Sequence, residues 1–302
     1  MKSIICAIVK DEQLFIREWV EWNLAKGFDA IYIYEDYGSK SHKEYLKDYI
    51  KKGKVFLTAI EGSGLGFTKR GVGGADASTQ GQLYRWFLNK CKNKEIETDW
   101  LAFFDVDEFI DFEEGWDLNR LEEEFDDTPG ILLSWVLYGA NGHINRPKEG
   151  VVKSYTSHLP LGSIMPRERS WTSLKSLINI KNNEGYGTSF HRIAGCIKTD
   201  KIGTSKGPLC FEKAWINHYY TKSFEDYCNR MFSRGNMQNN FRDFDQFFYF
   251  NPELLPQKIE MLESVRYKHC ASTMWISREE KLISGGNLWI IENLSKKLVA
   301  RI

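Results

Sequence analysis

The sequence predicts an α/β fold with a mostly parallel sheet and helices packed on both of its faces. Between Met1 and Ile60, apolar runs of strand length alternate with segments of helical periodicity, and the connections between them are short. Strand–helix–strand units joined by right-handed crossovers build a parallel sheet of this kind. With 302 residues, the chain is long enough for one sizeable α/β domain or for two small ones.

Five elements are predicted in this part of the chain. They are strands at residues 3–9, 30–34 and 55–60, a helix that starts near Asp11, and a shorter helix at residues 43–50. Asp11 is the expected N-cap of the first helix, because a short polar side chain can accept the free backbone N–H groups of the first turn. Gly27 is its expected C-terminal stop.

A glycine-rich segment follows the third predicted strand, between residues 61 and 79. It contains a G-x-G-x-G pattern at Gly62, Gly64 and Gly66, as dinucleotide-binding loops do. We reject that interpretation, because the dinucleotide pattern follows the first strand of a sheet and opens directly into a helix. A flexible loop fits better, from which Lys69 and Arg70 could reach a phosphate. A helix is then expected at residues 80–91.

The central motif of the chain is the run WLAFFDVDEFIDF at residues 100–112. Residues 100–104 are typical of a strand buried on both faces, and the strand ends at Asp105 and Asp107. In an extended segment these two aspartates would share one face, and Val106 would point back into the core. Open α/β sheets bind their ligands at this end of the strands. A divalent cation would relieve the repulsion between the carboxylates; the alternative is one helix cap and one solvated aspartate.

The rest of the chain is less regular. The expected elements are a helix around Leu118, a strand at residues 131–137, a strand at residues 215–220, and a helix from Ser223 to Gly235. Asp226 stands three residues after Ser223, in an arrangement close to a capping box. Residues 144–210 mix short apolar pieces with prolines and show no readable pattern. Residues 236–302 are expected to form a helical or mixed segment packed on the domain.

Composition argues against several functions. Basic and acidic residues balance at 41 each, so net charge does not indicate a nucleic acid as the partner. The six cysteines show no C-x-x-C or zinc-finger spacing, and buried free thiols in a reducing cytosol are expected. The first apolar run is too short for a signal peptide or a membrane span. We expect a cytoplasmic protein, with peripheral association at the inner face of the membrane left open.

Six motifs in the same order resemble glycosyltransferase family 92 and the related family 2-like enzymes, bacterial members in particular. They are Lys10-Asp11-Glu12 before a Trp-containing helix, residues 31–36 with Glu35-Asp36 at their end, D-x-D-E-F at residues 105–109, the strand and loop at residues 135–143, Lys175-Ser176 ahead of His191, and residues 218–223 with the helix that follows. Together they cover most of the chain up to Gly235. Asp11 stands where the family more often has asparagine, and residues 61–79 and the tail beyond 236 match no part of the pattern.

The resemblance implies a Rossmann-like fold of the GT-A type and a metal-dependent glycosyltransferase, here a hexosyltransferase. The sugar would move from a nucleotide-diphosphate sugar, with a UDP-sugar expected, to a hydroxyl of a glycan or glycolipid during polysaccharide biosynthesis. Family members of this kind invert the anomeric centre. The implied GT-A domain covers residues 1–235, with a nucleotide-binding half at 1–112 and an acceptor-side half at 113–235. Residues 236–302 would be a C-terminal helical extension.

This reaction gives the polar residues candidate roles. Mn²⁺ or Mg²⁺ would stabilise the charge on the departing diphosphate, and its expected ligands are Asp105, Asp107 and His218. The residues expected to bind the nucleotide are Lys10, Asp11, Glu12, Asp36, Asp105 and Lys222. Inversion requires a general base, for which the candidates are Glu108, His191 and Glu184. The structural alternatives are a hydrogen-bonded His218, a solvated Lys222, a turn residue at Asp36, and a Glu108 that only directs the loop.

Two other functions stay open as alternatives. A sugar-1-phosphate nucleotidyltransferase is also α/β and metal-dependent, but it usually has a Gly- and Arg-rich loop where Lys10-Asp11-Glu12 stand here. A catalytically silent glycan-binding protein would keep the abundant aromatic residues, and the intact Asp105/Asp107 pair argues against it. Hydrolysis of a nucleotide-sugar in the presence of Mn²⁺ would distinguish these classes.

Overall fold

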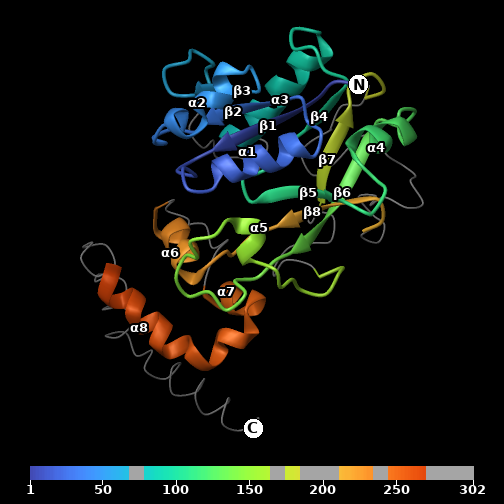
Figure 1. Cartoon of the computed structure of the whole chain (residues 1–302). Coiled ribbons are helices and arrows are strands. Elements are labelled where there is room, and N and C mark those ends of the chain that lie inside the picture. The colour runs from blue at the N-terminus through green and yellow to red at the C-terminus, as the bar shows by residue number, and fades with distance from the viewer. Residues whose placement is uncertain (68–77, 164–173, 184–210, 234–243, 270–302) are drawn as a thin grey trace. The chain divides into compact units, whose positions relative to one another are not determined.

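The computed structural model describes residues 1–67, 78–163, 174–183, 211–233 and 244–269 (Figure 1). The chain divides into two compact units, Met1–Tyr227 and Cys228–Ile302, and each is described by itself. The expected domain boundary at residue 235, the two halves of the domain and the packing of the extension on it stay predictions.

The first unit is built on an eight-stranded sheet with the order β3-β2-β1-β4-β7-β6-β8-β5. Its strands are β1 (Ser3–Val9), β2 (Ala30–Glu35), β3 (Val55–Ala59), β4 (Trp100–Ala102), β5 (Glu108–Phe112), β6 (Gly130–Leu137), β7 (Leu174–Asn179) and β8 (Ala214–His218). The first four run parallel to one another. β7 is antiparallel to both β4 and β6, whereas β8 is parallel to β6 and antiparallel to β5. The predicted α/β fold with a mostly parallel sheet is confirmed.

Helices cover both faces of this sheet, as the sequence predicts. The helices within this unit are α1 (Ile16–Ala25), α2 (Lys43–Lys51), α3 (Thr79–Lys92), α4 (Leu118–Glu124) and α5 (Val151–Ser154). A further helix, α6 (Phe224–Ser233), begins in this unit and continues into the second. Successive side chains of a strand point to opposite faces. On β1, Ile4 and Cys6 pack in one apolar cluster with Phe87 of α3, whereas Ser3 hydrogen-bonds Glu122 of α4 on the opposite face.

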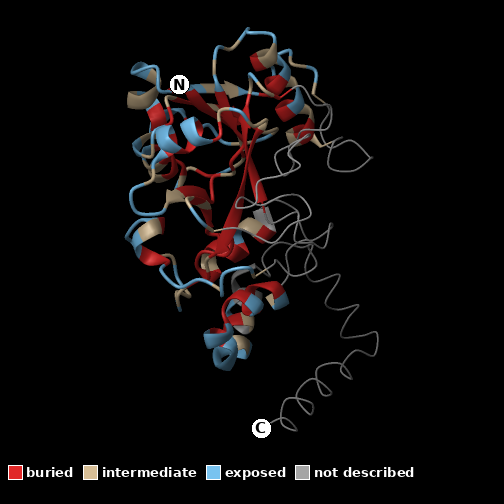
Figure 2. Ribbon diagram, turned by 90° about the vertical axis from the view of Figure 1, so that its right-hand side faces the viewer, coloured by how far each residue is buried: buried red, intermediate tan, exposed pale blue. Residues whose placement is uncertain are grey.

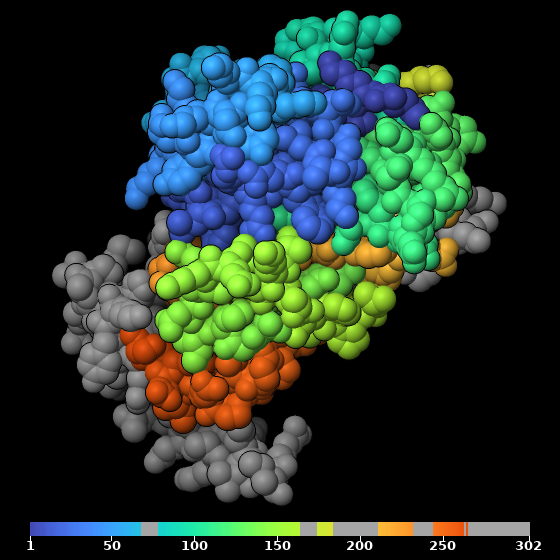
Figure 3. All heavy atoms as spheres, viewed as in Figure 1, coloured from blue at the N-terminus to red at the C-terminus, as the bar shows by residue number. Residues whose placement is uncertain are grey.

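The core follows the strands, most of which Figure 2 shows as buried, whereas the edge strand β3 is only partly buried. On the surface in Figure 3, the yellow-green segment that contains α5 borders the blue segment that contains α1. A carboxylate joins these two helices: Glu18 of α1 accepts the backbone N–H groups of Val151 and Val152, at 2.6 and 3.1 Å. Gly150, just before α5, leaves the room for this carboxylate, because a Cβ there would lie 2.5 Å from Glu18 Oε1.

Three sequence-based expectations differ from the structure. Asp11 does not cap α1, which begins at Ile16 with Phe15 at the N-cap position; Asp11 instead has a positive φ of 55° in a loop. β7 was not predicted, because Lys175 and Ser176 interrupt its apolar pattern although both are buried. The third difference, in the acidic motif, belongs to the site described below.

The described part of the second unit is helical. It contains α7 (Phe244–Phe250), the 3₁₀ helix η4 (Pro252–Gln257) and α8 (Lys258–His269). The sequence predicted a helical or mixed segment here. Across the described residues of both units, no helix combines the length and the apolar character that a membrane crossing requires.

Candidate active site

The candidate site lies at the carboxyl edge of the parallel strands. Because β1, β2 and β4 run parallel, their carboxyl ends meet at one edge of the sheet. Lys10 and Asp11 follow β1, Asp36 follows β2, and Asp105 lies three residues beyond the end of β4. The placement predicted for these strand-end residues is therefore found, although their roles stay predictions.

The two aspartates of the central motif lie in a turn, and not in the extended strand that the sequence analysis expected. The chain turns at residues 105–108, where Glu108 donates its backbone N–H to the carbonyl of Asp105 at 3.0 Å. The physical reason is that the chain must leave β4 and enter β5, which pairs with β8 elsewhere in the sheet. Val106 is buried as predicted. The two carboxylates consequently differ: the Asp105 side chain is 34% exposed and that of Asp107 is 3% exposed.

Two side chains hold the Asp105 carboxylate in place. Gln80, in the first turn of α3, donates from Nε2 to Oδ1 at 3.0 Å. Lys175 of β7 donates from Nζ to Oδ2 at 2.8 Å. The sequence analysis assigned neither residue a role, although Lys175-Ser176 is one of the six motifs. A lysine inside an otherwise apolar run is the sequence signal that could have indicated a role for Lys175. The sequence around Gln80 contains no such signal.

The Glu108 side chain stabilises the turn from its buried side. Its Oε2 accepts the backbone N–H of Asp105 at 2.9 Å and lies 3.2 Å from Lys175 Nζ, and neither the Glu108 nor the Lys175 side chain has any exposed surface. Burial raises the pKa of the Glu108 carboxyl well above its usual value, the charge of Lys175 opposes this, and the neighbouring aspartates reinforce it. Burial lowers the pKa of Lys175, but Asp105 and Glu108 outweigh burial, so the net pKa is raised. Lys175 is therefore a buried ammonium ion.

Asp107 faces His218, at the end of β8. Its Oδ1 lies 3.8 Å from Nε2 of His218, beyond hydrogen-bond distance, and both side chains are nearly buried. The His218 ring packs against Trp135, with ring centroids 4.3 Å apart. The backbone also joins these segments, because Tyr219 donates its N–H to the carbonyl of Asp107 at 2.8 Å.

This pair fits a divalent cation. Two ligands about 2.1 Å from one ion lie roughly 3.0–4.2 Å apart, depending on the angle between them, and 3.8 Å falls within that interval. The carboxylate suits Mn²⁺ or Mg²⁺, whereas an imidazole is a more usual ligand of Zn²⁺, Cu²⁺, Fe²⁺ or Ni²⁺. Among the described residues, no group of three or more His, Cys, Asp or Glu side chains is placed to hold a metal. Two protein ligands are still enough for an ion that keeps water and substrate phosphate oxygens as further ligands.

Lys222, four residues after His218, is nearly buried rather than solvated. Its backbone has a positive φ of 52°. Its Nζ lies 4.5 Å from the centre of the Phe15 ring, which the Arg146 guanidinium also approaches, at 5.6 Å. Phe15 immediately precedes α1, so the ammonium group of Lys222 lies near the loop that follows β1.

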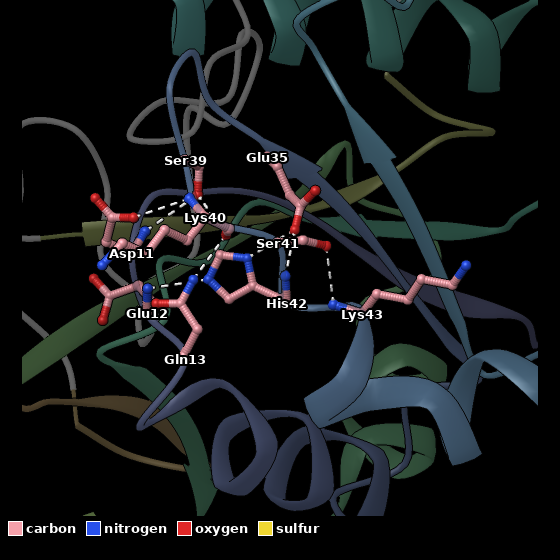
Figure 4. A network of polar contacts seen from close by, with 9 residues as sticks. All are labelled: Asp11, Glu12, Gln13, Glu35, Ser39, Lys40, Ser41, His42 and Lys43. Carbon is pink, nitrogen blue, oxygen red and sulfur yellow. Dashed lines mark hydrogen bonds and ion pairs between the residues drawn. The ribbon is translucent and has the colours of Figure 1, made fainter.

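The loops after β1 and β2 are tied together by hydrogen bonds (Figure 4). Asp11 donates its backbone N–H to Ser39 Oγ at 3.2 Å, and its Oδ1 accepts the backbone N–H of Lys40 at 3.0 Å. Lys10 Nζ donates to the carbonyl of Tyr37 at 2.9 Å. Asp36 accepts the backbone N–H of Tyr37 at 2.8 Å. Most of these hydrogen bonds join a side chain to a backbone group, and together they hold the two loops in one arrangement.

A buried histidine anchors the same two loops. His42 Nε2 accepts the backbone N–H of Glu12 at 3.0 Å, and Nδ1 lies 3.0 Å from Oε1 of Glu35 (Figure 4). Since Nε2 is an acceptor, the proton sits on Nδ1 and is donated to the Glu35 carboxylate. His42 has no exposed surface. The sequence analysis gave it no role, because the contact depends on two loops that are 30 residues apart.

Two of the predicted general bases, His191 and Glu184, lie outside the described residues, as do Lys69 and Arg70 of the glycine-rich segment. Glu108, the third candidate base, is described, and its full burial and its ion pair with Lys175 favour the loop-directing alternative.

An acidic turn at the carboxyl edge of a mostly parallel sheet, beside two strand-end loops, is the arrangement that the resemblance to GT-A type transferases implies. Comparison with known protein families agrees. The chain belongs to glycosyltransferase family 92, which matches residues 3–246. No curated protein matches the sequence.

Several solved structures have low similarity to the chain. Residues 1–349 of TarS from S. aureus share 16% identity, with a TM-score of 0.35, over 60% of this chain and 47% of that one. HddC from Yersinia pseudotuberculosis shares 14% identity, with a TM-score of 0.36, over 75% of this chain and 96% of that one. A UDP-glucose pyrophosphorylase complexed with UDP-glucose shares 12% identity, with a TM-score of 0.34, over 80% and 100%. The chain thus spans about half the length of TarS 1–349, and similarity of this degree does not distinguish among functions.

Proposed function

We propose that this protein transfers a sugar from a nucleoside-diphosphate sugar to a hydroxyl group of a glycan or glycolipid, in a divalent-metal-dependent reaction that inverts the anomeric centre. Family membership supports the reaction class. The observation that carries the proposal further is the Asp107–His218 pair, 3.8 Å apart, beside the acidic turn at the end of β4. A TarS structure is described as a complex with UDP, so UDP-sugars are the first donors to test.

Asp107 and His218 are the residues that would hold Mn²⁺ or Mg²⁺. When bound, the ion supplies Lewis-acid stabilisation of the negative charge that develops on the departing diphosphate. Asp105 would then have the separate role that the sequence analysis left open. Its partly exposed carboxylate, fixed by Gln80 and Lys175, would accept a hydrogen bond from a ribose hydroxyl of the donor.

The strand-end loops would bind the rest of the nucleotide. Lys10, Asp11, Glu12 and Asp36 lie in the two loops that close the ends of β1 and β2. Hydrogen bonds between the two loops, such as the one that Lys40 N–H donates to Asp11 Oδ1, fix the loops before a donor arrives, which reduces the entropy lost on binding. Lys222 is held near the end of the first loop, at Phe15, and would place a positive charge beside the diphosphate.

Inversion requires one displacement, in which a base takes the proton of the acceptor hydroxyl as the hydroxyl oxygen attacks the anomeric carbon. Such a base is worth roughly 10²–10⁴-fold in rate. We retain His191 for this role and assign Glu108 to holding the turn, since a carboxyl group with no exposed surface does not reach an acceptor. A cytoplasmic location at the inner face of the membrane stays a prediction.

A donor screen tests the proposal. The protein is mixed with a panel of nucleotide-sugars, with and without Mn²⁺, and thermal unfolding is followed because a ligand that binds only the folded state raises its stability. The best donor is then assayed for Mn²⁺-dependent release of the nucleoside diphosphate. Release of pyrophosphate from a nucleoside triphosphate and a sugar phosphate would indicate the nucleotidyltransferase instead. Binding of glycans alone, without donor turnover, would indicate the silent glycan-binding protein.

A further inference from the structure

Lys175 occupies a buried position directly beneath the acidic turn. β7 runs antiparallel to β4, with Ala102 opposite Leu177, so the first residues of β7 lie beside the point where the chain leaves β4. This register brings Lys175 Nζ to 2.8 Å from Oδ2 of Asp105 and 3.2 Å from Oε2 of Glu108. The lysine side chain has no exposed surface. A fully buried ammonium ion between two carboxylates is costly to remove from water and must be paired.

The pairing divides the carboxylates of the turn into two kinds. Asp105 and Glu108 share the positive charge of Lys175, and Asp105 is further fixed by Gln80. Asp107 points to the other side, toward His218 at the end of β8. A cation that approaches the turn therefore meets one carboxylate already engaged with an ammonium ion and another that faces an imidazole, a common metal ligand.

We propose that Lys175 keeps Asp105 away from the metal, so that Asp107 is the carboxylate that binds the cation and the protein retains the ion only together with the donor diphosphate. The inference rests on the proposed function. Lys175 acts here as a positioning residue. With a single protein carboxylate, the free site binds a hard cation weakly, and the diphosphate oxygens complete the coordination when the donor binds.

The proposal predicts that one substitution, Lys175→Met, raises the affinity for Mn²⁺ and lowers donor turnover. Lys175→Met removes the ammonium ion that holds Asp105 and allows Asp105 to become a second carboxylate ligand. The buried Glu108 carboxyl, whose pKa burial already raises, loses the opposing charge of Lys175 and takes up a proton. Affinity for Mn²⁺ without nucleotide should then rise about tenfold or more. Donor turnover should fall, because Asp105 is no longer held for the nucleotide. A lysine with only a structural role would lower both quantities when removed.

The experiment measures Mn²⁺ binding by the electron paramagnetic resonance signal of the free aqueous ion, with and without UDP, on the full chain. Lys175→Met is compared with wild type and with Lys181→Met, a control that removes an exposed lysine of the same segment paired with Asp126. Circular dichroism checks that each variant is folded. Because Lys175→Met removes the counter-ion of the buried Glu108 carboxyl and can thereby unfold the protein, Glu108→Gln and the double variant Lys175→Met/Glu108→Gln are measured as a second pair.

The outcomes separate this inference from the proposed function. Tighter Mn²⁺ binding without UDP in Lys175→Met, or in the double variant relative to Glu108→Gln, supports the inference. Equal or weaker binding in the folded variants overturns it, provided that wild type binds Mn²⁺ with UDP. If wild type and Lys181→Met bind no Mn²⁺ even with UDP, the metal-dependent function itself fails, and this inference fails with it.

Discussion

The acidic turn after β4 and the loops after β1 and β2 lie at the same edge of one sheet, yet they are stabilised differently. The turn concentrates three carboxylates and places a buried ammonium ion, Lys175, between two of them. In the loops, the side chains of Lys10, Asp11 and His42 instead pair with backbone C=O and N–H groups. Under the proposed function, charge chemistry would belong to the turn, whereas the loops would provide a rigid surface for an uncharged part of the donor.

The largest effect is expected at the turn. Asp107→Asn should reduce donor turnover about a thousandfold, since Lewis-acid stabilisation is worth several kcal/mol. The fold should be kept, as circular dichroism would show. The matched variant in the loops is Asp36→Asn, which we expect to raise the KM for the donor less than about tenfold and to leave Mn²⁺ affinity unchanged. Equal losses in both variants would remove the distinction between turn and loops.

A buried carboxyl group outside the turn sharpens the comparison. Glu122 of α4 is buried beside Ser3, and burial raises the pKa of its carboxyl from 4.5 to about 7, although the hydrogen bond from Ser3 opposes this. A raised carboxyl pKa stabilises the fold at low pH, and this contribution is lost as pH rises from about 4.5 through 7. Glu122→Gln should therefore stabilise the protein above pH 7, by up to about 3 kcal/mol. Chemical denaturation at pH 5 and pH 8 measures this, and an equal effect at both values would contradict it.

The third variant breaks the anchor of the loops. His42→Phe keeps an aromatic ring at this position, although a larger one, and removes the acceptor for Glu12 N–H and the partner of the Glu35 carboxylate. We expect the free energy of unfolding to fall by about 1–3 kcal/mol, the usual cost of a buried polar group that loses its partner. The donor KM should rise while Mn²⁺ affinity stays at the wild-type value. A loss of Mn²⁺ affinity in the folded variant would mean that loops and turn act as one site.

An effect smaller than that of Asp107→Asn is expected at His218. His218→Ala should weaken Mn²⁺ binding measured with UDP by about tenfold, or about 1.4 kcal/mol, since a carboxylate and the diphosphate oxygens remain as ligands. Isothermal titration of Mn²⁺ into the UDP complex gives this number. The Trp135 ring packs on His218, so Trp135→Phe serves as a packing control. An unchanged titration would remove His218 from the metal site.

Local patterns in the sequence predicted the first half of the fold well. The strand at residues 3–9 has the bounds that the apolar run indicates, and α2 and α3 lie within one residue of the predicted helix at each end. These elements bury apolar side chains at regular spacing, so their pattern is visible without knowledge of their neighbours. The capping pair after β8 was equally visible: Asp226 donates its backbone N–H to Ser223 Oγ at 3.1 Å.

Features that depend on contacts between distant residues were not predictable in this way. Glu108 was visible beside the D-x-D motif, but its ion pair needs Lys175, on a strand that follows much later in the chain. Lys175 is also the reason why β7 was not predicted. A charged residue usually indicates an exposed position, and the partners that allow Lys175 to be buried are not visible in the local sequence. The turn at residues 105–108 has the same origin, since it follows from the pairing of β5 with β8.

The most direct test of the account is a crystal structure with Mn²⁺ and UDP, in which anomalous scattering locates the ion. We predict one Mn²⁺ within coordination distance of Asp107 Oδ1 and His218 Nε2, bridged to the diphosphate, with Asp105 still bound to Lys175. An ion bound away from this pair, or an Asp107 carboxylate directed into solvent, would contradict the account.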